Sequence, residues 1–199
     1  MGWVFKYLWV LIYTLVLVWS GIDPKDQFTW LLEVLPAIVG GLLLLITFKS
    51  FPLTPLLYLL ILVHCIVLMI GGHYTYAEVP FFEGLFGAER NNYDKVGHFA
   101  QGFIPAILAR EVLIRKQVVS GRAWLNLYVV SVCLAFSAFY ELIEWWVALL
   151  TGEDAEAFLG TQGYIWDTQS DMGLALTGAI CAILLLSRWH DQQLKKLSA

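Results

Sequence analysis

The sequence predicts an all-α protein, a polytopic transmembrane bundle of about six helices. Of its 199 residues, 59% are hydrophobic and 14% are charged, and the mean hydropathy is +0.71. Soluble domains contain about 25% charged and about 45–50% apolar residues, so lipid is the expected solvent for most of this chain. Long apolar runs that recur along the whole sequence, with short polar connections between them, are the second observation that favours this class.

Six stretches are long enough to cross a membrane, which takes roughly 20 mostly apolar residues. They cover about 4–21, 29–48, 53–73, 96–115, 123–150 and 164–188. The first stretch has no A-x-A cleavage pattern, so we expect it to be a retained helix. The longest connection, residues 78–94, mixes aromatic and acidic residues and is expected to lie on the membrane surface. With no repeat or soluble module in the chain, residues 1–199 are expected to form a single transmembrane domain.

The distribution of basic residues predicts the orientation of the bundle. Nine of the twelve Lys and Arg residues fall in the N-terminal segment, the second-to-third connection, the fourth-to-fifth connection and the tail. The positive-inside rule therefore places both termini in the cytoplasm. The residues expected to anchor that side against anionic lipid headgroups are Arg110, Glu111, Arg115 and Lys116. A basic group in the tail, expected to act as a topological anchor, consists of Arg188, Lys195 and Lys196.

The fourth predicted helix begins with a group of polar residues. An ionisable side chain inside a membrane segment costs about 2.5–3.5 kcal/mol on insertion scales, so each one calls for a partner, a cavity or a function. Asp94 and His98 are four residues apart and share one helical face, and Gln101 follows one turn deeper. We therefore expect Asp94 and Gln101 to orient His98.

Two further helices carry carboxylates at the same expected level of the bundle. Near the end of the fifth helix, Glu141 and Glu144 share a face with Ser137, and Asp167 and Asp171 stack at the start of the sixth. Because successive helices alternate in direction, these ends are expected to meet on the outward side, together with the end of the third helix. The expected site residues are His98, Glu141, Glu144, Asp167 and Asp171, and the expected supporting residues are Asp94, Gln101 and His73.

So many carboxylates around one histidine need a compensating positive charge. A bound divalent metal, shared protons or a cationic substrate could each supply it. Carboxylate and imidazole ligands suit zinc, manganese or iron, and the spacings resemble those by which helical bundles present inward ligands. The structural alternative is that these side chains pair with Lys95, with one another or with the backbone, and only fix the helix register.

These residues leave three functions open. The first is an enzyme, a hydrolase or transferase acting on a lipid or lipid-linked headgroup, in which the site residues bind a metal or act as acid and base. The second is a proton- or cation-coupled transporter. The sequence shows no second polar cluster toward the cytoplasmic end, and this argues against transport. The third is a membrane assembly factor without catalysis. Membrane lipids are the expected partners, and no basic stripe indicates nucleic acid.

Three segments also carry a family resemblance. The Asp-Lys-Val-Gly-His-Phe run at 94–99, the paired glutamates and the Trp-Asp-Thr-Gln-Ser-Asp-Met run at 166–172 resemble the YjdF-type family of bacterial inner-membrane proteins. The Asp-Lys-x-x-His element and the later Asp-x-x-x-Asp are similar, more loosely, to VanZ-like membrane proteins associated with glycopeptide resistance. The first resemblance implies a multi-pass protein of the bacterial inner membrane and supplies no reaction.

Overall fold

The computed structural model describes residues 3–76, 78–82, 91–151 and 166–197, and the regular elements in these ranges are all α-helices. Their bounds are α1 (Trp3–Ser20), α2 (Gln27–Thr47), α3 (Pro55–His73), α4 (Tyr93–Arg115), α5 (Arg122–Thr151) and α6 (Asp167–Leu197). The predicted all-α bundle is thus confirmed. Within the described part, five of the helices are long and apolar enough to cross a membrane. The other is α4, whose five charged residues lower its hydropathy.

The helices begin and end within about three residues of the predicted positions, apart from the end of α6. Because this helix continues to Leu197, nine residues beyond the predicted end at 188, it has 31 residues. At 1.5 Å per residue it is about 46 Å long, which exceeds the roughly 30 Å of a hydrocarbon core. The last turns of α6 are therefore polar helix rather than loop. Most of the predicted surface connection, residues 83–90, lies outside the described residues.

The chain divides into two compact units, and three helices contribute residues to both: α3, which is divided between Leu60 and Ile61, α4 and α5. Unit 1 contains residues 1–52, 61–97 and 144–165, and unit 2 contains residues 53–60, 98–143 and 166–199. Both α4 and α5 pass from one unit into the other, α4 between Gly97 and His98 and α5 between Ile143 and Glu144.

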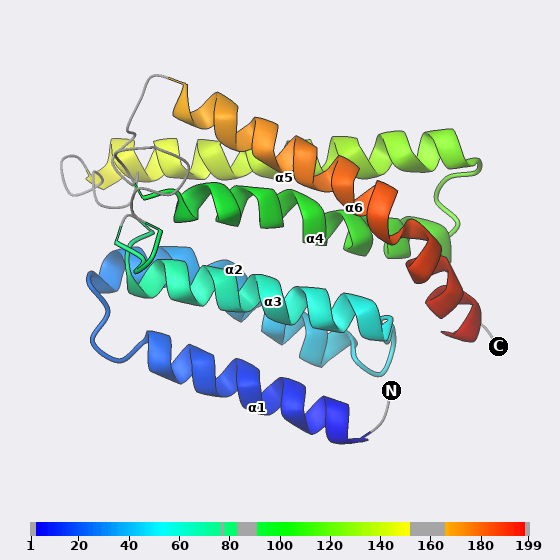
Figure 1. The fold of residues 1–199 in the computed structure, drawn as a ribbon, viewed down its shortest axis with the longest axis horizontal. Helices are drawn as coiled ribbons and strands as arrows, with labels where there is room; N and C mark the ends of the chain where they lie inside the picture. Colours follow the sequence, from blue (N-terminus) through cyan, green and yellow to red (C-terminus); the bar gives the residue numbers. More distant parts are fainter. Residues whose placement is uncertain (1–2, 77, 83–90, 152–165, 198–199) are drawn as a thin grey trace. The chain divides into compact units, whose positions relative to one another are not determined.

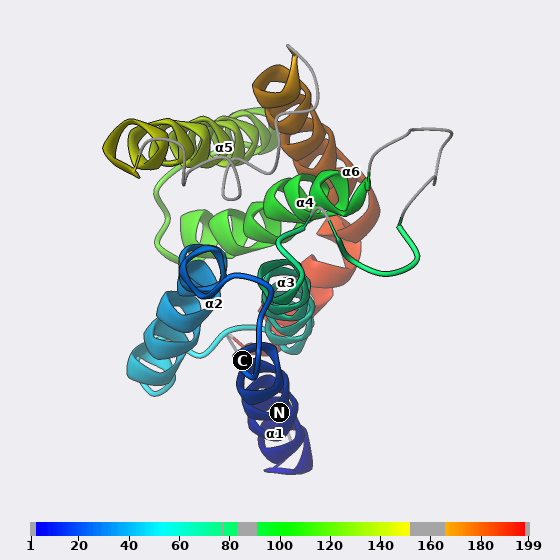
Figure 2. The same cartoon turned by 90° about the vertical axis from the view of Figure 1, so that its left-hand side faces the viewer.

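Unit 1 is built on the packing of α1, α2 and α3, which appear as three neighbouring helices in Figures 1 and 2. Val34 and Ala37 of α2 and Met69 of α3 are almost fully buried in its core. Two hydrogen bonds join α1 to α2: Tyr13 donates to the carbonyl of Ala37 at 2.9 Å, and the Trp30 indole donates to Ser20 at 3.2 Å. In an apolar solvent such bonds satisfy groups that lipid cannot.

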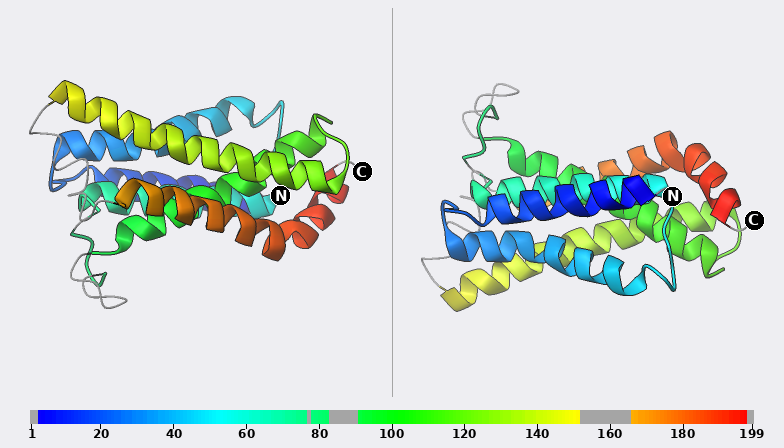
Figure 3. Two further views of the ribbon diagram at one scale, coloured as in Figure 1. Left: turned by 90° about the horizontal axis from the view of Figure 1, so that it is seen from above. Right: turned by 90° about the horizontal axis from the view of Figure 1, so that it is seen from below.

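Unit 2 is held together by very close packing of α4 on α6. A Cβ on Gly102 would collide with the backbone of Ala175, and a Cβ on Gly178 would collide with the backbone at Phe99. Small residues allow membrane helices to approach to this distance, since lipid offers little hydrophobic drive for association. The last turns of α6, drawn in red in Figure 3, lie at the same end of unit 2 as the end of α4. The α4–α6 contact therefore fixes the positions of the polar side chains at both ends of these two helices.

Candidate metal site around His98

His98 lies in the second turn of α4, within unit 2, with 9% of its side chain exposed. Its Nε2 atom lies 3.9 Å from Oδ2 of Asp171 on α6, whose side chain is 7% exposed. The gap is too long for a hydrogen bond, which requires about 2.7–3.2 Å. Two bonds of about 2.0–2.2 Å, the usual length for imidazole and carboxylate ligands, would span it. The pair is thus spaced for a shared ion.

The other ring nitrogen of His98 faces a different pair of side chains. Nδ1 lies 3.0 Å from Oε1 of Gln101, one turn further along α4. It lies 4.0 Å from Oε1 of Glu141 on α5, a side chain that is 8% exposed. When Nδ1 carries the proton and donates it to Gln101, Nε2 presents a lone pair toward Asp171. Metal-binding histidines are generally oriented by such a bond from their second nitrogen.

Local sequence explains how α6 presents a carboxylate at this position. Asp171 lies one turn after Asp167, the first residue of α6, and the helix dipole favours negative charge at this end of the helix. Ser170 donates a hydrogen bond to the carbonyl of Asp167 at 2.8 Å and lies 3.5 Å from Asp171. The start of α6 therefore holds a carboxylate against His98.

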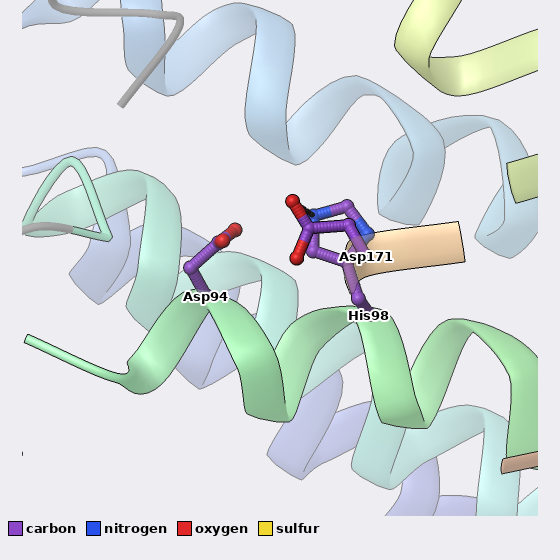
Figure 4. A group of neighbouring side chains, drawn as sticks. All are labelled: Asp94, His98 and Asp171. Atoms are coloured by element: carbon purple, nitrogen blue, oxygen red, sulfur yellow. Dashed lines mark ion pairs between the residues drawn. The ribbon is translucent and has the colours of Figure 1, made fainter. Parts of the chain in front are cut away.

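Asp94 lies one turn before His98 on α4. Asp94 and His98 project from successive turns of this helix, and their ligand atoms lie within 4.8 Å of each other. Figure 4 shows both side chains on α4, with the carboxylate of Asp171 beside the His98 ring. An imidazole and oxygen ligands suit zinc, manganese or iron, the metals that the sequence predicts.

The other residues that the sequence predicted for the site differ in the unit to which they belong and in their contacts. Asp167 is buried, 6% exposed, one turn before Asp171 on α6. Glu144 and Asp94 belong to unit 1, as does His73. His73 pairs through Nδ1 with the carbonyl of Ser20 at 3.0 Å and packs on Trp19, so its contacts anchor α1. Within unit 2 the structure brings His98, Glu141 and Asp171 together.

Tyr76, between α3 and α4, is a polar residue of unit 1 that the sequence analysis did not single out. Its ring packs against Gly71, Gly97 and Tyr93. Burial raises the pKa of Tyr76 well above its usual range, and negative charge nearby adds to the effect. The carboxylates that contribute to this increase are Glu33, Asp94 and Glu144. Unit 1 thus carries its own group of acidic residues around a buried phenol.

A second buried polar cluster lies at the far end of α4 and α6, and it corrects two predictions. Arg110 and Glu111, expected to face lipid headgroups, are 5% and 0% exposed. Both contact His190 of α6, at 2.8 and 2.9 Å. The expectation of no second polar cluster was therefore wrong. The prediction failed because charged residues beside a basic connection have the sequence pattern of interface anchors. The contact of α4 with α6 shows that Arg110 and Glu111 point into the protein instead. Of the four residues predicted as anchors, Lys116 is the exposed one.

Comparisons with known proteins agree with the membrane fold. Residues 5–192 match the family described as "Predicted membrane protein (DUF2238)". The chain is 53% identical over 186 residues to the inner membrane protein YjdF of Escherichia coli strain K12, an alignment that covers 92% of this chain and 89% of that protein. No solved structure matches the chain. The chain therefore belongs to the DUF2238 family of predicted membrane proteins, and the relative and the helices together support a multi-pass protein of the inner membrane.

Proposed function

We propose that this protein is a divalent-metal-dependent hydrolase or transferase that acts on a lipid or lipid-linked headgroup. The observation that carries the proposal is the setting of His98, whose Nε2 faces Asp171 across 3.9 Å while Nδ1 bonds to Gln101 at 3.0 Å. In this arrangement Gln101 orients one ring nitrogen, and the other faces a carboxylate at the distance of two ligands that share an ion.

The chemistry follows from the donor set. His98 and Asp171 would hold the ion, and a metal of this kind acts as a Lewis acid and lowers the pKa of water. Gln101 keeps the proton on Nδ1, so that the lone pair of Nε2 stays available. Glu141, whose Oε1 lies 4.0 Å from Nδ1 of His98, adds a second carboxylate beside the ring and would serve as an acid or base for the reaction. Asp94 offers a further carboxylate on the same helix.

Purified protein and bacterial lipids would test this proposal. The full chain, in detergent micelles with a total inner-membrane lipid extract, should release or transfer headgroups when zinc or manganese is present. Chelation should stop the reaction and added metal should restore it, with lipids and products measured by mass spectrometry. The His98→Gln protein should be inactive. An unchanged lipid extract after incubation with metal-loaded protein would contradict the enzymatic function.

A transporter is the second candidate, and the buried cluster around His190 favours it. A coupled transporter needs polar groups at more than one depth along the membrane. Polar clusters lie at both ends of α4 and α6, around His98 and around His190. Between the two clusters, the backbones of α4 and α6 are in contact at Gly102 and Gly178. This contact leaves no room for water between the two helices at these positions, which argues against a transport path there. Liposomes that accumulate a metal ion or proton only with wild-type protein would support transport over catalysis.

A further inference from the structure

His190 is a fully buried histidine near the end of α6, between two charged residues of α4. Its Nδ1 atom lies 2.8 Å from Nη1 of Arg110, and its Nε2 atom lies 2.9 Å from Oε2 of Glu111. Both distances are those of good hydrogen bonds. The ring thus bridges a cation and an anion.

The chemistry of these partners fixes the protonation of the ring. A guanidinium group can only donate hydrogen bonds, so Nδ1 of His190 must accept from Arg110 through its lone pair. A carboxylate accepts, so Nε2 must carry the proton and donate it to Glu111. This geometry admits only the neutral imidazole with its proton on Nε2.

Other groups of unit 2 complete the network around His190. Glu111 also accepts from the backbone N–H and the hydroxyl of Thr54 and from Arg115 at 2.9 Å, while Arg110 donates to Asp191 at 2.6 Å. Close by, the side chain of Gln193 accepts from the backbone N–H of Leu56 at 2.9 Å. The network therefore joins the last turns of α6 to the end of α4 and the start of α3.

Among the ion pairs and hydrogen bonds of the described residues given above, the positive and negative charges are equal in number while His190 is neutral. Arg110 and Arg115 supply two positive charges, and Glu111 and Asp191 supply two negative ones. Tyr58 adds a neutral phenol near Glu111. A proton on Nδ1 would set an N–H group against the Arg110 N–H and leave one uncompensated positive charge in a buried setting, which is costly.

We propose that this network is a proton-sensitive latch, which holds the last turns of α6 while His190 is neutral and releases them when His190 is protonated. Acidification supplies the proton that breaks the Arg110 bond, so the latch would open as the pH falls. The proposal depends on unit 2 alone and stands whether the His98 site is an enzyme or a transporter.

His190→Gln is the matched variant for a test. Glutamine offers one acceptor for Arg110 and one donor for Glu111, and it does not titrate. Hydrogen exchange of residues 190–197 would be compared between the two full-length proteins in nanodiscs. At about pH 7.5 the two should exchange alike, and at about pH 5 the wild type should exchange at least about tenfold faster. Comparison within each pH cancels the intrinsic effect of pH on exchange.

Equal exchange of the two proteins at both pH values would overturn the latch. A second measurement needs no variant: the nitrogen chemical shifts of histidine-labelled wild-type protein report which ring nitrogen of His190 carries a proton. We expect a proton on Nε2 alone at about pH 7.5 and on both nitrogens at about pH 5. A proton on Nδ1 at about pH 7.5 would contradict the proposed hydrogen bonds, even if His190→Gln fails to fold.

Discussion

Nδ1 of His98 lies 3.0 Å from Oε1 of Gln101, three residues further along the same helix. Because both residues belong to α4, the helix itself keeps this contact in place. The bond determines which ring nitrogen faces Asp171, and so it determines whether a lone pair is available there.

Removing the acceptor at position 101 should weaken metal binding without unfolding the protein. In Gln101→Met the shape is kept and the oxygen is lost, so His98 can present an N–H to Asp171. We expect zinc affinity to fall about 10–100-fold, the usual effect of losing a partner of a metal ligand. Competition titration measures this change, and Gln101→Glu, which keeps an acceptor, should recover most of it. Full affinity in Gln101→Met would show that this bond does not orient His98.

The backbone contact between α4 and α6 should be intolerant of a methyl group. In Gly102→Ala the new Cβ collides with the backbone of Ala175, so the helices must move apart. We expect a destabilisation of about 1–3 kcal/mol, as is typical of overpacking, measured by unfolding in detergent. Gly173→Ala is the matched control on α6, where a Cβ would meet nothing within 4 Å. If the two variants are equally stable, the close approach of α4 and α6 is incorrect.

The N-cap of α2 should contribute stability that depends on pH. Asp26 accepts from the backbone N–H of Thr29 at 2.6 Å, and this bond lowers the pKa of the Asp26 carboxyl. A lowered pKa means that the contribution is present above the unfolded value of about 3.9 and is lost as the pH falls through the folded value. Asp26→Ala should cost about 0.5–1 kcal/mol at neutral pH, and less in acid.

The Asp26→Ser variant tests whether the stability comes from the capping hydrogen bond or from the charge of the carboxylate. Serine still accepts from the backbone N–H of Thr29, so most of the stability at neutral pH should remain. The acid-dependent part should disappear, because serine does not titrate. Unfolding in detergent at about pH 7 and about pH 3.5 measures both effects. A pH dependence that is the same in all three proteins would mean that the Asp26 carboxylate does not cap α2.

The architecture was largely predictable because it depends on composition. Apolar runs of sufficient length determine where the helices lie, and their ends are set by Pro, Gly and polar residues that lipid excludes. The end of α6 was missed because its polar last turns, which contain His190, look like a tail. In the structure these turns stay helical and dock on Arg110 and Glu111.

The candidate site was predictable in part. The bond between His98 and Gln101 follows from helical spacing, which is visible in sequence. The pairing of His98 with Asp171 required two helix ends to meet, and the alternating directions of the helices indicated this. The contact of Glu111 with His190 joins positions 79 residues apart, at helix ends that were predicted to face lipid headgroups, and no local pattern indicates it. Inward rotation of a helix end is a tertiary property.

The orientation of the bundle remains a prediction. Positive-inside counting places both termini in the cytoplasm. Reporter fusions after Gly21, Phe51, Asn91, Gly121 and Gly152 would test this, and those after Gly21, Asn91 and Gly152 should report the outer side. Gly152 lies outside the described residues, so this fusion tests the connection between α5 and α6 independently. A cytoplasmic signal at Gly152 would reverse the inferred placement of the His98 site.

Metal binding to purified full-length protein tests the central claim most directly. Wild-type protein should bind one zinc or manganese ion per chain, and His98→Gln and Asp171→Asn should each lose it while remaining folded. The matched controls are His64→Gln, another histidine within a helix, and Asp191→Asn, another aspartate of α6; both should bind as the wild type does. Wild-type protein that binds no ion, or His98→Gln protein that binds as tightly as wild type, would contradict the proposed metal site.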